Sequence, residues 1–180
     1  MNKRVFISIS IPEKAKKRLL KTIEKWQDLP VKWVREANLH ITLVFLGFID
    51  EAVIPEICEK VEKTCKKASI FDIEFNQIEL FPSVDDPKLV ALTGKTSEEL
   101  KNLVNSIEGE LGVSNVPKKS FRPHITLGRI RKHKWEALED RPTIQEPFAF
   151  PVAVESVEIV SSELDEDKLN CTVLGSYPLQ

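Results

Sequence analysis

Two of the three histidines in the chain occur in the same four-residue sequence. The first copy is His40-Ile41-Thr42-Leu43, the second is His124-Ile125-Thr126-Leu127, and the spacing between them is 124 − 40 = 84 residues. With ordinary amino-acid usage, a given histidine is followed by Ile-Thr-Leu on the order of once in a few thousand cases. The repeat therefore indicates an internal duplication that places two equivalent strands around a pseudo-two-fold axis.

Imidazole side chains suit proton transfer at neutral pH because their pKa lies near 6.5, so one of a pair can be neutral while the other is protonated. One then removes a proton from water and the other protonates a leaving oxygen, and each role is typically worth ~10²–10⁴ in rate. Residues two apart on a strand share a face, which places Thr42 beside His40 and Thr126 beside His124. The pattern predicts phosphoryl chemistry with two catalytic histidines and two phosphate-binding threonines, without a metal or other cofactor.

Other roles for these histidines fit the pattern less well. A single histidine on an apolar strand is usually a core residue, but duplication of the whole motif beside a basic segment favours catalysis. A zinc site needs more ligands than two histidines, and no Asp, Glu or Cys stands at ligand spacing. His133 has no threonine partner and lies among basic residues, so we expect it at the surface.

Charge is spread unevenly along the chain. The net charge is −2, which is not that of a general nucleic-acid coat. From Leu111 to Trp135 there is no acidic residue, and the segment holds seven cations: Lys118, Lys119, Arg122, Arg129, Arg131, Lys132 and Lys134. This local positive field suggests an anionic ligand, although a solvated basic loop is an equally good explanation of the segment by itself.

Hydrophobic periodicity predicts the elements that position the two motifs. Alternating or apolar runs predict strands at 4–11, 31–34, 39–48, 71–81, 88–93, 121–130, 148–162 and 169–179. Helical spacing predicts helices at 13–28, 51–68 and 98–111. Mixed helices and strands with hairpin-like neighbours are typical of an α+β fold with largely antiparallel sheets. No linker divides the chain, so residues 1–180 are expected to form a single domain.

The remaining features point to a cytoplasmic protein without a membrane span. Cys58, Cys65 and Cys171 are an odd number with no CxxC pair, which argues against a disulfide framework. The basic start and apolar run at the N-terminus are interrupted by serines and stopped by Pro12, so we interpret them as a strand and not a signal peptide.

Gly94-Lys95-Thr96 copies the end of a P-loop, but Leu89 stands where the pattern needs glycine.

Both histidine motifs resemble those of the 2H phosphoesterase superfamily, which is defined by two His-x-Thr motifs. Within it, the chain is most similar to the RNA 2′,3′-cyclic phosphodiesterases of the ThpR/LigT type, historically called 2′-5′ RNA ligases. The resemblance covers nearly all of the chain. It rests on the opening strand from Arg4, on the segments from Leu39 to Gly47 and from Phe121 to Arg129, and on Ser162-Glu163-Leu164 with Tyr177 near the end.

This resemblance implies two lobes with a cleft between them and opening of a 2′,3′-cyclic phosphate to a 2′-phosphate. By family position, Arg129 binds the phosphate and Phe45 lies beside the substrate. Each stands five residues after its histidine, and this odd spacing would turn it away from the cleft on an ideal strand, so a β-bulge or strand end is required. By family analogy His124 is the base and His40 the acid.

Three functions follow as hypotheses. The leading one is an RNA 2′,3′-cyclic phosphodiesterase acting on an RNA 3′ end or nucleotide, as a monomer. The second is an enzyme for small cyclic nucleotides or ADP-ribose cyclic phosphate, or one that runs the reverse 2′-5′ ligation. The third is a non-catalytic binder of RNA ends, which would require a broken motif, whereas all four His and Thr residues are present. Trp33 and Arg35 precede the first motif, and Trp33 is as compatible with a core position as with the cleft.

Overall fold

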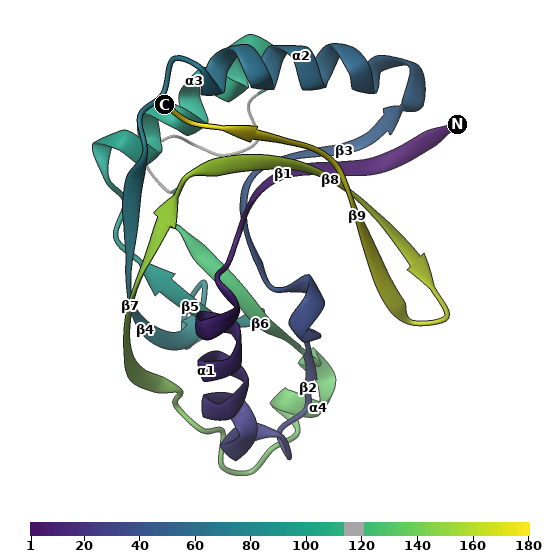
Figure 1. Ribbon diagram of the computed structural model, residues 1–180. Helices are drawn as coiled ribbons and strands as arrows, with labels where there is room; N and C mark the ends of the chain where they lie inside the picture. The colour runs from purple at the N-terminus through teal and green to yellow at the C-terminus, as the bar shows by residue number, and fades with distance from the viewer. Residues whose placement is uncertain (114–120) are drawn as a thin grey trace.

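Antiparallel strands dominate the structure, a computed structural model that describes residues 1–113 and 121–180 (Figure 1). The strands are β1 (Asn2–Ser10), β2 (Val31–Trp33), β3 (His40–Asp50), β4 (Phe71–Phe81), β5 (Leu89–Gly94), β6 (His124–Ile130), β7 (Gln145–Val154), β8 (Ser156–Asp165) and β9 (Lys168–Pro178). Every strand pair in this part of the chain is antiparallel, so the α+β fold class predicted from the sequence is confirmed.

One nine-stranded sheet contains both motif strands at its centre. The strand order is β7-β4-β5-β6-β3-β1-β8-β9, and β2 pairs with β6 outside this path. Only one residue pair, Ile41 with Ile125, joins β3 to β6, so this contact connects two antiparallel halves. The arrangement of these halves as lobes related by a pseudo-two-fold axis stays a prediction, as does the description of residues 1–180 as a single domain.

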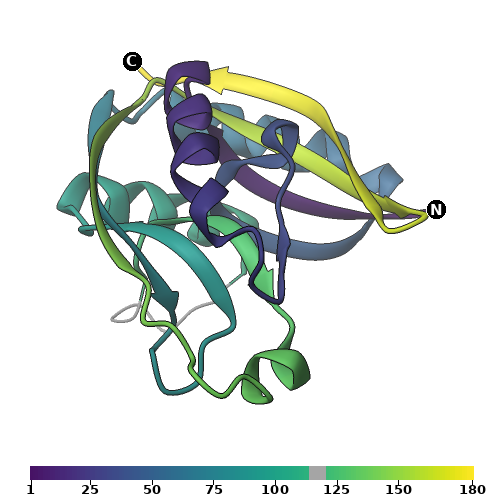
Figure 2. The same ribbon diagram turned by 90° about the horizontal axis from the view of Figure 1, so that it is seen from below.

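Three longer helices cover the sheet: α1 (Glu13–Ile23), α2 (Ile54–Cys65) and α3 (Glu98–Leu111). In the two views, α2 and α3 lie side by side on one side of the strands and α1 on the other (Figures 1 and 2). The Ser97 side chain caps α3 by accepting a hydrogen bond from the Leu100 N–H at 3.1 Å, and Gly112 ends the helix in the left-handed conformation. No helix in the described residues is long and apolar enough to cross a membrane.

One predicted strand is wrong. The expected strand at 148–162 is two strands, β7 and β8, separated by Glu155 and placed near opposite ends of the sheet, where β7 pairs with β4 and β8 with β1. Buried residues occur at even positions up to Val154 and at odd positions from Val157 to Ile159. This change of phase in the alternation marks the break, because a continuous strand keeps its buried side chains at one parity.

The structure also contains shorter elements: η1 (Glu24–Trp26), η2 (Glu36–Asn38), η3 (Glu51–Val53) and α4 (Lys132–Glu136). η1 and η3 lie within the ranges of the two predicted helices at 13–28 and 51–68. η2 and α4 have no counterpart in the prediction, and the buried Trp135 anchors α4 to the core. The turn between β8 and β9 has positive φ at both Glu166 and Asp167, as a tight two-residue hairpin turn requires.

Gly94, which resembled part of a P-loop, is needed for close packing of β4 and β5. A Cβ atom at this position would lie 2.5 Å from the backbone oxygen of Glu74. We therefore expect Gly94→Ala to lower the free energy of unfolding by about 1–3 kcal/mol in urea denaturation. Gly109→Ala is the control, because nothing lies within 4 Å of its Cβ position on α3. That substitution should raise stability by about 0.5–1 kcal/mol, and equal effects of the two would contradict this role of Gly94.

Candidate active site

The two motif strands have the same burial pattern and the same irregularity. From His40 on β3 and from His124 on β6, buried, half-buried and exposed residues follow each other in the same order over seven positions. Ser8 and Ile7 of β1 pair with Thr42 and Val44 of β3. Leu43 of β3 has no pairing partner on β1 and forms a bulge. Such a bulge re-aims the residues that follow it, as bulges in antiparallel pairs generally do.

The second bulge occurs at the equivalent leucine. On β6, Ala91 pairs with Thr126 and Val90 with Gly128, so Leu127 is the extra residue. Arg129 then pairs with Leu89, two residues from Ala91 on β5, and so lies on the same face as Thr126. The bulge that the odd spacing of Arg129 requires is present, and so is the one for Phe45, which pairs with Phe6.

Backbone carbonyl groups fix the orientation of both imidazoles. Nδ1 of His40 lies 2.6 Å from the Asn38 oxygen, and Nδ1 of His124 lies 3.2 Å from the Arg122 oxygen. A carbonyl oxygen only accepts hydrogen bonds, so Nδ1 of each ring carries a proton and donates. Nε2 is therefore the nitrogen of each neutral ring that can accept a proton. In His40 it also lies 2.8 Å from the hydroxyl oxygen of Thr42.

A phenylalanine ring stacks on each imidazole. Phe6 of β1 lies on His40 with ring centroids 4.8 Å apart, and Phe81 of β4 lies on His124 with centroids 4.7 Å apart. The Arg122 guanidinium is also 5.7 Å from the Phe81 ring centroid. Together with the carbonyl bonds, these rings hold both imidazoles in defined positions. Sequence reasoning missed Phe6 and Phe81, because each lies on a different strand from the histidine that it contacts.

Burial is the main influence on the pKa of His40, and it lowers that pKa. The hydrogen bond to Asn38 opposes this shift, while the nearby charges of His124 and Arg129 lower the pKa further. The carboxylate of Glu158 acts in the raising direction. His40 therefore loses its proton at a lower pH than a free histidine, but a negative charge nearby partly offsets the shift.

Burial also lowers the pKa of His124. The hydrogen bond to the Arg122 carbonyl raises it, and the positive charges of Arg122 and Arg129 lower it again. Within the described residues, no carboxylate opposes the shift in the pKa of His124 as Glu158 does for His40. The surroundings of His124 thus favour the neutral ring more consistently than those of His40.

Folding stability should therefore decrease as the pH falls through the range where histidine titrates. A histidine in the unfolded chain has a pKa near 6.5, whereas the pKa values of His40 and His124 are lower in the folded protein. As the pH falls, the unfolded chain therefore binds protons before the folded protein does, and this shifts the equilibrium toward the unfolded state. We expect a smaller free energy of unfolding by urea at about pH 5.5 than at about pH 7.5. The double variant His40→Asn/His124→Asn should lose less, and an equal loss in both proteins would contradict the lowered pKa values.

A cavity of about 380 Å³ contains most of the predicted site residues. His40, Thr42, Phe45, Thr126 and Arg129 all line it. His124 is not among the lining residues, but it lies two residues before Thr126 on the same strand, and its charge reaches His40. The fold thus brings the two motifs together, with His124 beside the cavity and His40 in its wall.

Only part of the basic segment belongs to this cavity. Arg129 lines it, whereas Arg122 forms an ion pair with Glu79 at 3.6 Å. Lys118 and Lys119 lie outside the described residues. Arg131, Lys132 and Lys134 are exposed around α4, together with His133, as expected for a surface histidine.

Most of the charge in the cavity comes from elsewhere in the sequence. Five cationic side chains and one carboxylate line it: Arg4, Lys32, Arg35, Arg129, Lys168 and Asp167. Four of the five cations lie far from the segment that the charge pattern singled out. Trp33 is half-buried and also lines the cavity, so it belongs both to the packing of the protein and to the cleft.

The tip of the β8–β9 hairpin forms one wall of the cavity and is tied to the segment before His40. Arg35 Nη2 donates a hydrogen bond to the Leu169 oxygen at 2.6 Å, and Asn38 Nδ2 donates to the same oxygen at 2.8 Å. Lys32 Nζ donates to the Asp167 oxygen at 3.3 Å. Asn38 therefore holds both the hairpin and, through its own carbonyl, the His40 ring.

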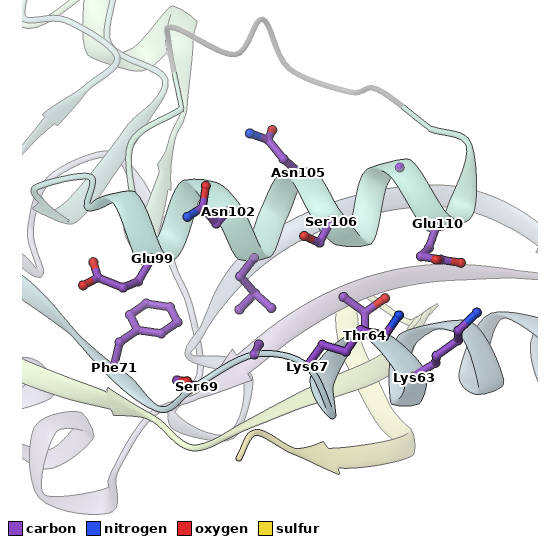
Figure 3. Close-up of a pocket in the computed structure, with 13 residues that line it drawn as sticks. Lys63, Thr64, Lys67, Ser69, Phe71, Glu99, Asn102, Asn105, Ser106 and Glu110 are labelled. Atoms are coloured by element: carbon purple, nitrogen blue, oxygen red, sulfur yellow. The ribbon is translucent and has the colours of Figure 1, made fainter.

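A second, larger cavity of about 590 Å³ lies between α2 and α3 (Figure 3). Its lining is mixed in charge, with Lys63 and Lys67 on the α2 side and Glu99 and Glu110 on α3. None of the predicted site residues lines it. The cavity with the two motifs, although smaller, is the one with chemically suitable groups.

Comparison with known proteins agrees with this fold. The family model of the 2′-5′ RNA ligase superfamily matches residues 12–166. A Thermotoga maritima protein named RNA 2′,3′-cyclic phosphodiesterase is 32% identical over 169 residues, which cover 89% of this chain and 87% of the relative. An Aquifex aeolicus protein of the same name is 32% identical over 147 residues, 78% of this chain and 72% of the relative.

Solved structures share the whole fold. TT0787 of Thermus thermophilus matches with a TM-score of 0.83 at 23% identity, covering 98% of this chain and 97% of the other. E. coli LigT complexed with 3′-AMP matches with a TM-score of 0.78 at 21% identity, covering 99% of both chains. Fold and site thus define an antiparallel α+β protein with two His-x-Thr strands. This chain belongs to the 2′-5′ RNA ligase superfamily.

Proposed function

We propose that this protein is an RNA 2′,3′-cyclic phosphodiesterase that opens a terminal cyclic phosphate to a 2′-phosphomonoester. The observation that carries the proposal is the shared geometry of the two histidines, each of which uses Nδ1 for a backbone carbonyl and keeps Nε2 for proton transfer. The cationic cavity beside them suits an anionic substrate. The name shared by the curated relatives supports the choice of substrate.

In this proposal His124 is the base and His40 the acid. Neutral His124 takes a proton from water, the water oxygen forms a bond to phosphorus, and the bond from phosphorus to O3′ breaks. Protonated His40 gives its proton to O3′, and proton exchange with solvent restores both rings. Burial lowers the pKa of both rings, and Arg129 lowers both further. The charges support these roles because those that act on His124 are all cationic, whereas the carboxylate of Glu158 acts on His40 in the raising direction.

Arg129, Thr42 and Thr126 bind the phosphate in this proposal. The guanidinium of Arg129 offers paired N–H donors that match two phosphate oxygens. The two hydroxyls lie on the same strand faces as the histidines and donate to the remaining oxygens. Phe45 is 41% exposed and offers an apolar ring at the side of the cavity. No metal has a role in this scheme.

The direct test is hydrolysis of an oligoribonucleotide with a 2′,3′-cyclic phosphate end, in the presence of EDTA. We expect turnover without metal and a product that co-migrates with the 2′-phosphate standard and not with the 3′-phosphate. Turnover that EDTA abolishes would contradict the metal-independent mechanism. Failure to hydrolyse the oligonucleotide, with hydrolysis of ADP-ribose cyclic phosphate instead, would assign the enzyme to small nucleotides.

We also propose that the enzyme works in the cytoplasm as a monomer. The three cysteines are unpaired in the structure, which is usual in a reducing compartment. Size-exclusion chromatography with light scattering should give a mass near 20.5 kDa.

A further inference from the structure

The cavity continues past the histidines along β1. Arg4 and Phe6 are two residues apart on this strand and share a face, so their side chains are spaced by about 7 Å along it. Phe6 stacks on His40, which places Arg4 one step further from the reacting phosphate. Ser162 of β8 pairs with Arg4, and both residues line the cavity. Arg4 and Ser162 thus mark a second polar position at a distance from the two motifs.

The guanidinium of Arg4 is positioned but not neutralised. It lies 5.1 Å from the centroid of the Phe45 ring, in a cation–π contact. No carboxylate in the described residues forms an ion pair with it, whereas the neighbouring Lys3 pairs with Glu51 at 3.6 Å. Lys32 and Arg35, which also line the cavity, donate to backbone oxygens of the hairpin. Arg4 therefore retains its charge and its donors for a ligand.

We propose that Arg4 and Ser162 bind the phosphodiester that joins the terminal nucleotide to the preceding one, with Phe45 as a stacking surface for a base. The proposal rests on the function proposed above and specifies its substrate as an oligonucleotide end. Arg129 serves the cyclic phosphate near the imidazoles, and Arg4 serves the next phosphate along the chain. A guanidinium and a hydroxyl are suitable donors for phosphate oxygens, and aromatic rings stack on unpaired bases without sequence preference.

The test compares three substrates, of which the two dinucleotides differ only in the charge of the internal linkage. They are adenosine 2′,3′-cyclic phosphate, the dinucleotide ApA with a 2′,3′-cyclic end, and the same dinucleotide with an uncharged methylphosphonate in place of its internal phosphodiester. For the wild-type protein we expect kcat/KM to be about ten- to a hundredfold higher with the charged dinucleotide than with either of the others, because one charge-assisted contact is worth that much.

Arg4→Gln should remove most of this preference, and Ser162→Ala should reduce it in the same direction. Lys3→Gln is the matched control, because it removes the same charge from the next residue of β1, which does not line the cavity. This control should keep the full preference. Circular dichroism and thermal unfolding of each variant show whether it is folded, and the serine variant gives a second test if Arg4→Gln is not.

Several outcomes would overturn the inference. They are equal kcat/KM values for mononucleotide and dinucleotide in the wild type, an unchanged preference in Arg4→Gln, or an equal loss with mononucleotide and dinucleotide in that variant. The last result would mean that Arg4 contacts the terminal nucleotide. Failure of the wild type to hydrolyse any of the three substrates would instead overturn the proposed function itself, and the inference with it.

Discussion

Replacement of His40 or His124 by alanine is expected to lower kcat for the cyclic phosphate by ~10²–10⁴ each, because each variant lacks one of the two proton transfers. The double variant should be little slower than the worse single variant, since groups that act together in one step do not contribute independently. Steady-state or single-turnover hydrolysis of the oligonucleotide measures these losses.

The third histidine supplies the control. His133 is exposed on α4 and lies outside the cavity, so His133→Ala should retain full activity. If His133→Ala lost as much activity as the other two variants, the assignment of the catalytic pair would be wrong.

The pH dependence of the residual activity distinguishes the acid from the base. Loss of rate at low pH reports protonation of the base, and loss at high pH reports deprotonation of the acid. His124→Ala should therefore remove the acidic limb of the profile, and His40→Ala the alkaline limb. The opposite result would exchange the two roles while leaving the two-histidine mechanism intact.

Replacement of Arg129 by alanine is the second large effect, with an expected loss of ~10²–10³ in kcat, because a charged donor to the transition-state oxygens disappears. Arg129→Lys should recover only part of the loss, since an ammonium group cannot contact two oxygens in the planar geometry of guanidinium. Arg131→Ala is the control, as this exposed arginine lies two residues away and does not line the cavity.

Arg129 should also influence the pH optimum. Its positive charge lowers the pKa of both histidines, so its removal should raise both values and move the rate maximum toward higher pH. A loss of activity with an unchanged pH profile would show that the arginine binds phosphate without affecting the imidazoles. An Arg131→Ala profile that moved equally would show a general effect of net charge.

Local patterns predicted the elements best where the decisive residues were close together in sequence. The bounds of α3 follow from its Ser97 cap and Gly112, which act within one turn of the helix. The two motif strands were found because their residues repeat. The break at Glu155 was missed, since extended sequence continues on both sides and only the phase of the buried residues changes.

For the site, the sequence indicated groups carried by the motif strands but not those brought in by neighbouring strands. Phe45 and Arg129 were assigned by family position, and two leucine bulges explain how they reach the cleft. Arg4, Phe6 and Lys168 depend on which strands pair with which. Strand order is a property of the whole sheet, so no local pattern around these residues could reveal their position.

The attachment of the β8–β9 hairpin affects how freely this protein could change its substrate preference. The shortest contacts that hold the tip end on main-chain oxygens of Asp167 and Leu169, which every amino acid possesses. These contacts therefore do not depend on which side chains Asp167 and Leu169 carry. Substitutions at Leu164, Lys168 and Leu169 can alter the shape and charge of the cavity wall while these main-chain contacts and the catalytic groups stay the same. Substrate preference can therefore change at this hairpin independently of catalysis.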